Sequence, residues 1–306
     1  MKQQMTLDRL KPWVLPGAML AGVIFHNYMS RVEALAPYLI FAMLLITFCK
    51  VKPKELKITG LTWSLLAVQT AGAVAVYLAL LPFGKDMAQG TMICVFCPTA
   101  TAAPVITGML GGSVPRLATS SIISNITVAV TAPLLFSAVG SGQSIDFIAS
   151  AHSIATKVVP LIIAPLALAF ILLAVAPKAH AAIASKQSWS FYIWAVSLFI
   201  VVGRAVSFVI SEPAGKIPEM IVIALCSAAV CGIQFIAGRK IGARFGDKIA
   251  GAQGLGQKNT VLAIWMALTY LNPISSVGPA AYVAWQNTVN TLQLYYHDKK
   301  TRTRKL

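Results

Sequence analysis

The stretch "GAQGLGQKNTVLA", residues 251–263, places glycines, amides and a lysine between two apolar segments. The chain around it has 306 residues, of which 57% are hydrophobic and only 11% charged, and its mean hydropathy is +0.75. Soluble domains carry roughly 25% charged residues. The composition therefore predicts an all-α membrane protein, and this glycine-rich stretch would interrupt a helix inside the bilayer.

Apolar runs of about 20 residues, the length that a helix needs to span a bilayer, recur along the whole chain. Prolines and glycines gather inside the fourth and the ninth of these runs. We therefore expect about ten transmembrane helices. The predicted spans are 12–28, 34–49, 59–82, 87–110, 116–138, 149–175, 189–210, 217–238, 248–271 and 274–296.

The basic residues fall unevenly on the two sides of such a membrane. Of the 25 lysines and arginines, the predicted spans contain Lys157, Arg204 and Lys258, and one side receives only Arg31, Lys85 and Lys216. All the others fall on the opposite side. Because basic loops stay in the cytoplasm, we expect a multi-pass protein of the cell (inner) membrane with both termini cytoplasmic. The net charge of +16 then comes mostly from basic cytoplasmic loops, and the basic tail could contact anionic lipids of the bilayer. We expect no nucleic-acid partner.

The spans divide into two sets of five that resemble each other. A shift of roughly 158 residues lays spans three to five on spans eight to ten, and an odd number of spans inverts the second copy, as in many transporters. The matching interrupted segments are "VFCPTATAAPV" (95–105) and "GQKNTVLA" (256–263), which contain Thr101 and Thr260. Unwound backbone cannot face lipid. We therefore expect the two breaks to meet in a shared polar interior.

Over nearly its full length, the chain resembles the bile acid:sodium symporter family of organic-anion transporters. The segment "CPTATAAPVITGMLGGSV" (97–114) is similar to the CPGGT-containing fourth helix of that family, "TAPLL" (131–135) to the end of the fifth, and "QGLGQKNTVLA" (253–263) to the ninth. The resemblance implies crossed discontinuous helices 4 and 9, with substrate binding between two domains. The two domains would be a panel (residues 1–58 and 139–211) and a core (59–138 and 212–298). A basic cytoplasmic tail (299–306) would follow them.

The chain departs from the family at the sodium ligands. Where sodium-coupled members have Ser-Asn in the fourth helix, this chain has Ala103 and Pro104, and Gln253 stands in place of a glutamate in the ninth. The following Gln-Asn becomes Gln257 and Lys258, so Gln257 is the one ligand that matches. All nine carboxylates of the chain also fall in predicted loops or at span ends. We therefore expect no metal and no cofactor, and two-sodium coupling is not expected here.

Lys258 is the central candidate residue, because an ionisable group at membrane depth indicates a functional site. Its ammonium could stand where a sodium ion sits in the relatives, bind a substrate carboxylate or sulfonate, or act as a proton-linked site. Alternatively, its long side chain could reach the cytoplasmic surface. We favour the tethered cation, alone or combined with the proton-linked role.

The other candidates surround this position or lie in the panel. The fifth span carries a polar stripe at helical spacing, which the tenth span repeats with Gln286, Asn287 and Asn290. Arg204 and Lys157 are possible anion contacts, and interfacial roles are equally open for both. The candidate substrate or ion site comprises Pro98, Thr101, Ser121, Ser124, Asn125, Gln253, Gln257, Lys258, Asn259 and Thr260.

The sequence thus predicts a secondary transporter of a small organic anion that works by alternating access. A cation/proton antiporter-like exchanger is an alternative, although such proteins need a membrane-embedded aspartate. A transport-dead membrane sensor of the same fold is another. The chain has neither HExxH nor GxSxG, so we do not expect an enzyme. Substrate identity, direction, driving ion and oligomeric state stay open.

Overall fold

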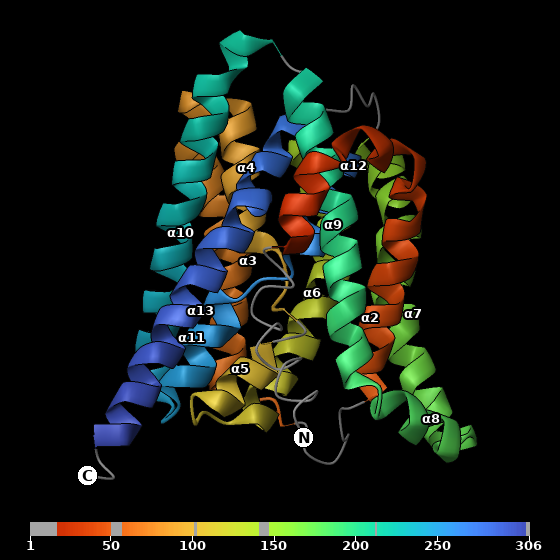
Figure 1. Ribbon diagram of the computed structural model, residues 1–306, viewed down its shortest axis with the longest axis vertical. Coiled ribbons are helices and arrows are strands. Elements are labelled where there is room, and N and C mark those ends of the chain that lie inside the picture. The colour runs from red at the N-terminus through yellow and green to blue at the C-terminus, as the bar shows by residue number, and fades with distance from the viewer. Residues whose placement is uncertain (1–16, 50–56, 101–102, 141–146, 212, 304–306) are drawn as a thin grey trace.

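The computed structural model describes residues 17–49, 57–100, 103–140, 147–211 and 213–303 (Figure 1). Within these ranges the regular elements are helices, and no strand occurs. The α-helices are α2 (Ala36–Cys49), α3 (Gly60–Leu80), α4 (Lys85–Phe96), α5 (Ala103–Met109), α6 (Val114–Val139), α7 (Phe147–Val175), α8 (Pro177–Ala184), α9 (Gln187–Ser211), α10 (Ile217–Arg244), α11 (Lys248–Gly256), α12 (Thr260–Tyr270) and α13 (Val277–Thr303). The short 3-10 helices are η1 (His26–Arg31), η2 (Glu33–Leu35), η4 (Leu81–Phe83), η5 (Ala214–Lys216) and η6 (Pro273–Ser276).

The predicted all-α class is confirmed for this part of the chain. Three helical segments are long and apolar enough to cross a membrane: Gly60–Phe83, Val114–Val139 and Ala214–Arg244. Shorter apolar helical segments are Glu33–Cys49, Val159–Val175, Ala195–Ser211 and Thr260–Tyr270. Each predicted span contains helix, including residues 17–24 of the first. The count of ten spans remains a prediction.

Helix α10 has an inverted distribution of polar and apolar side chains. It buries Ser227 and Gln234, whereas Ile221, Ile233 and Ile236 are more than half exposed. In a soluble protein the large apolar side chains would be inside. Exposed isoleucines around a polar interior are what a helix in contact with lipid requires, because the polar groups must find their partners within the protein.

The two interrupted spans are split as the sequence predicted. The fourth forms α4 and α5, which are separated after Phe96, and the ninth forms α11 and α12, which are separated after Gly256. Helix α11 packs closely on α10, since a Cβ added to Gly238 would lie 2.2 Å from the carbonyl oxygen of Gly251. Two glycines thus let the backbones of α10 and α11 approach closely.

Figure 1 shows two groups of long helices, and the half-helices α4 and α11 lie in the same group as α10. Helices α2, α7 and α9 lie together on one side, where α2 packs against both others. On the other side α10 contacts α4, α11 and α13. Helix α12 lies against α9, so the second half of the ninth span touches both groups.

Carboxylates lie at helix ends in the part of the chain whose side chains are described. Glu33 begins η2, and Asp86 and Glu219 lie in the first turns of α4 and α10. Asp247 caps α11: its carboxylate accepts hydrogen bonds from the backbone N–H of Ala250 and of Ser113, each at 2.8 Å. Negative charge is favourable at these helix N-termini. The expected placement of the acidic residues at span ends is confirmed for these four.

Candidate functional site

The two unwound segments cross and pair with each other. Thr99 and Lys258 form an isolated antiparallel bridge. Beside it, the N–H of Ala100 donates to the carbonyl of Gln257 at 2.9 Å, and the N–H of Asn259 donates to the carbonyl of Pro98 at 2.9 Å. Each break therefore satisfies backbone groups of the other, as unwound chain inside an apolar protein must. The prediction that the two breaks meet is confirmed.

Side chains from neighbouring helices cap the helix end before the first break. Gln69 of α3 donates to the carbonyl of Phe96 at 2.8 Å, and Ser124 of α6 donates to the Gln69 amide oxygen at 2.7 Å. The last carbonyls of a helix lack backbone partners. This chain of hydrogen bonds therefore holds the end of α4 at a fixed distance from α3 and α6.

The helix end before the second break is capped in the same manner. The hydroxyl of Tyr282, on α13, donates to the carbonyl of Gly256 at 2.8 Å. The hydroxyl of Thr99 donates to the carbonyl of Gly254, also at 2.8 Å, across the crossing. Both half-helices thus end in carbonyls that point into a polar interior and find side-chain donors there.

Lys258 lies at the centre of this crossing and is only 1% exposed. Its ammonium donates to the carbonyl of Val95 at 2.8 Å, and its backbone N–H donates to the Gln286 side-chain oxygen at 2.8 Å. A cation at the C-terminal end of α4 is favourable, because the helix dipole is negative there. Within the described residues no carboxylate pairs with this ammonium. The alternative in which Lys258 reaches the cytoplasmic surface is wrong.

Several buried polar atoms near the breaks make no hydrogen bond within the described chain. Buried polar groups in proteins are nearly always paired, so a cluster of unpaired ones indicates a place where a ligand or water binds. Most belong to the ninth span or to helices packed on it. They are Asn125 Oδ1, Gln253 Oε1, Gln257 Oε1, Asn259 Nδ2, Thr260 Oγ1 and Gln286 Nε2.

The polar stripe of the fifth span faces the first break. Ser124 accepts a hydrogen bond from the N–H of Thr99 at 3.2 Å, and Ser121 donates to the carbonyl of Thr99 at 3.3 Å. Asn125 donates to the carbonyl of Ser121 at 2.8 Å. Ser121 and Ser124 therefore contact the first break at Thr99, whereas this hydrogen bond of Asn125 stays within α6.

Thr101 of the fourth span lies outside the described residues. The candidates of the ninth span are all buried. The amide of Gln253 donates to Asn290 at 3.1 Å and to Gln293 at 2.9 Å, both on α13. Thr260 begins α12, and Asn259 caps it by accepting from the N–H of Leu262 at 3.3 Å. Side-chain hydrogen bonds thus join Gln253 and the backbone of Lys258 to the polar residues of α13.

Residues of this site that the sequence did not point to include Gln69, Thr99 and Tyr282. Gln69 could have been found from the sequence, because it is an amide within an apolar span. In the structure its side chain is 2% exposed. Thr99 lies two positions before Thr101, the threonine that the sequence pointed to. Only the structure shows that Thr99 is the residue paired with Lys258.

The charge of Lys258 bears on sodium, the cation that the family resemblance implies. The ammonium of Lys258 already neutralises the α4 carbonyl end. A second cation 4 Å from it would be repelled by about 4 kcal/mol even at an effective dielectric of 20. Among the described residues, no group of three or more histidine, cysteine or acidic side chains could hold a metal.

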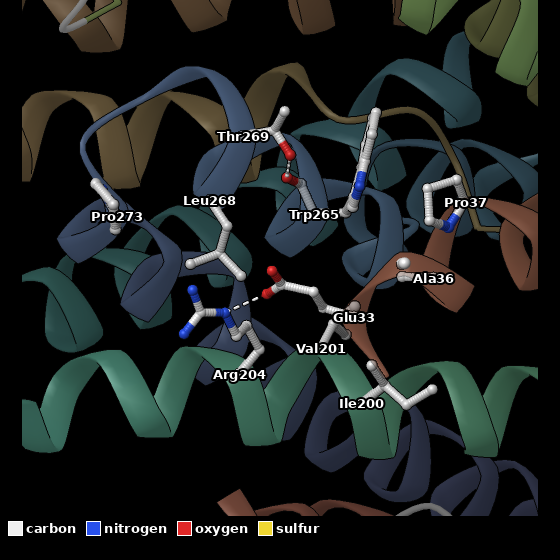
Figure 2. Close-up of a pocket in the computed structure, with 11 residues that line it drawn as sticks. Glu33, Ala36, Pro37, Ile200, Val201, Arg204, Trp265, Leu268, Thr269 and Pro273 are labelled. Carbon is white, nitrogen blue, oxygen red and sulfur yellow. Dashed lines mark hydrogen bonds and ion pairs between the residues drawn. The ribbon is translucent and has the colours of Figure 1, made fainter. Parts of the chain in front are cut away.

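Arg204 lies away from the crossing, on α9. Its guanidinium is paired with the carboxylate of Glu33, and Figure 2 shows the two side chains pointing toward each other. This acidic partner comes from η2, 171 residues away in the sequence. Lys157 belongs to α7, and its side chain is not among those described.

The Arg204–Glu33 pair lines a cavity of about 340 Å³ between the two groups of helices (Figure 2). Glu33 and Pro37 come from η2 and α2, and Arg204 comes from α9. The opposite wall includes Trp265 and Leu268 of α12. The cavity therefore lies where the α2–α7–α9 group meets the second half of the ninth span.

No protein-family model matches this chain, and no curated protein is similar enough to match it.

Proposed function

We propose that this protein is a secondary transporter of a small organic anion, with about ten transmembrane helices arranged as two inverted five-helix repeats. Three long apolar helices, four shorter apolar ones and the exposed isoleucines of α10 support a membrane location. The resemblance to the bile acid:sodium symporter family is part of this proposal, and so is placement in the inner membrane with cytoplasmic termini. The asymmetry of the basic residues supports that orientation.

Alternating access would move a panel against a core. The panel would contain α2, α7 and α9, which pack together, and the core would contain the crossing and the helices that hold it. The cavity beside Arg204 and Glu33 lies between these two groups, as a substrate route at their interface requires. Because the guanidinium is already paired, Arg204 would serve at the mouth of this route rather than as a free anion clamp.

The observation that carries the proposal is the buried ammonium of Lys258 at the crossing of two broken helices. A charge enclosed among neutral groups is expensive and is kept in membrane proteins for a function. Here it would replace the bound sodium of the relatives by neutralising the carbonyl end of α4. It would also supply the positive potential that holds an anion near the crossing, and exchange of its proton would link uptake to pH.

Uptake into proteoliposomes tests this proposal. Purified protein is screened with labelled organic carboxylates and sulfonates under sodium, under potassium and across a pH step. We expect uptake that does not need sodium, and its loss in Lys258→Ala and in Lys258→Arg, because the larger guanidinium cannot donate to Val95 from the same space. Lys178→Ala, which removes an exposed lysine of α8, serves as the matched control.

Two outcomes would overturn the proposal. Sodium-dependent uptake would remove the role given to Lys258. Saturable anion binding without any flux, measured on the same preparation by thermal shift, would favour the transport-dead sensor. Proton-driven uptake that disappears in Lys258→Ala would support the proton-linked form of the mechanism.

A further inference from the structure

A second cavity, of about 410 Å³, lies at the other end of the molecule from the Arg204–Glu33 pair. Its wall contains three side chains that carry or can carry positive charge: Arg239 of α10, Lys248 of α11 and His297 of α13. No ion pair of Arg239 or Lys248 occurs among the described residues. The nearby carboxylate of Asp247 is engaged by two backbone N–H groups. The described lining therefore contains basic side chains and no acidic one.

The rest of its wall is apolar and opens to the outside of the helices. Leu110, Val289 and Leu292 line it, and Leu292 is 50% exposed. On α10, the exposed Ile236 comes one turn before Arg239 and so lies on the same face of the helix. The basic groups thus stand at the end of an exposed apolar surface.

Aromatic residues mark the depth at which the cavity would sit in a membrane. Tyr295 and Tyr296 of α13 are both exposed and stack edge to face, with ring centroids 5.5 Å apart. Tyr296 also lines the cavity. Tyrosine is enriched at the boundary between hydrocarbon and water, where its ring is apolar and its hydroxyl is hydrated. The basic groups are therefore at the height of lipid headgroups.

We propose that this cavity binds the phosphate headgroup of an anionic phospholipid, with an acyl chain lying along the apolar face of α10. Arg239 would hold two phosphate oxygens with its planar guanidinium, and Lys248 would add a point charge. Basic pockets between helices on the cytoplasmic side of a membrane are suited to such headgroups. The size of the cavity is within the range of ordinary small-ligand sites.

The cavity is also connected to the crossing. Gln293 lines it and accepts a hydrogen bond from Gln253 at 2.9 Å. A bound headgroup would therefore fix the end of α13 against α11, and we expect it to stabilise the folded protein.

Thermal unfolding in mixed micelles tests the site. Phosphatidylglycerol, phosphatidylcholine and soluble glycerol phosphate are each added to wild-type protein, to Arg239→Gln/Lys248→Gln, and to a control, Lys178→Gln/Lys186→Gln. The control removes the same charge from exposed lysines that do not line the cavity. We expect phosphatidylglycerol alone to raise the melting temperature of the wild type and the control, and to bind the cavity variant at least about tenfold more weakly, since each basic residue near the surface contributes about 1 kcal/mol.

Three results would overturn the assignment. Equal stabilisation of the cavity variant by phosphatidylglycerol would mean diffuse attraction by the whole basic end. Equal stabilisation by glycerol phosphate would mean a site for a free phosphate ester. Native mass spectrometry of the wild type gives a readout that does not depend on the variant folding: retention of phosphatidylcholine as strongly as phosphatidylglycerol would also reject the site.

Discussion

Replacing Lys258 with methionine would separate its role in transport from its role in folding. Methionine keeps an unbranched side chain of similar length and removes the charge. The structure gives the ammonium one hydrogen bond, to the carbonyl of Val95 at 2.8 Å, and leaves the side chain 1% exposed. The substitution therefore removes a buried charge with little change in packing.

The effect on stability is the difference between opposing terms. A hydrogen bond to a charged group contributes about 1.5–3 kcal/mol. The interaction with the end of α4 adds up to about 2 kcal/mol. Against these, dehydrating a buried ammonium costs several kcal/mol, and no carboxylate among the described residues offsets that cost. We expect the free energy of unfolding of Lys258→Met to lie within about 2 kcal/mol of the wild type.

Transport should respond very differently. If the ammonium neutralises the crossing and attracts the anion, its loss should lower uptake at least about a hundredfold, which is about 2.7 kcal/mol of barrier. Thermal unfolding in detergent and proteoliposome uptake are measured on the same preparations, with Lys178→Met as the control. At about 2–4 °C per kcal/mol, the melting temperature should move by less than about 8 °C.

A larger fall in melting temperature, or failure to fold, would show that the ammonium is structural. Unchanged uptake in a stable Lys258→Met protein would remove Lys258 from the transport mechanism altogether.

The remaining predictions concern the packing and polar contacts around the site. Gly238→Ala should lower the free energy of unfolding by about 1–3 kcal/mol, because the added Cβ would meet a backbone oxygen of α11 at 2.2 Å. Gly232→Ala, on the same helix with open space around it, should change it by less than about 1 kcal/mol. Gln286→Leu should cost about 1–3 kcal/mol by leaving a buried N–H of the second break unpaired, and Gln286→Glu, which keeps an acceptor, should cost less. Neutralising Arg204 or Glu33 should change stability by less than about 1 kcal/mol, since both side chains are more than a third exposed. A double-mutant cycle measured by thermal unfolding checks that last value.

The sequence by itself determined the helical class and the two interrupted spans. These are local properties. Hydropathy over about 20 residues and the clustering of glycine or proline act within one segment. The polar stripes of the fifth and tenth spans were also readable, because helical spacing alone places them on one face.

Only the tertiary structure decided which groups meet. The two breaks pair through Thr99 and Lys258, a contact that the repeat pattern did not specify. Arg204 finds Glu33 across 171 residues. Such contacts depend on how helices are rotated and displaced against one another, and close packing, such as that of Gly238 on Gly251, sets this register. A shift of one residue in a helix would turn a different side chain toward the crossing, and no local pattern in the sequence specifies that shift.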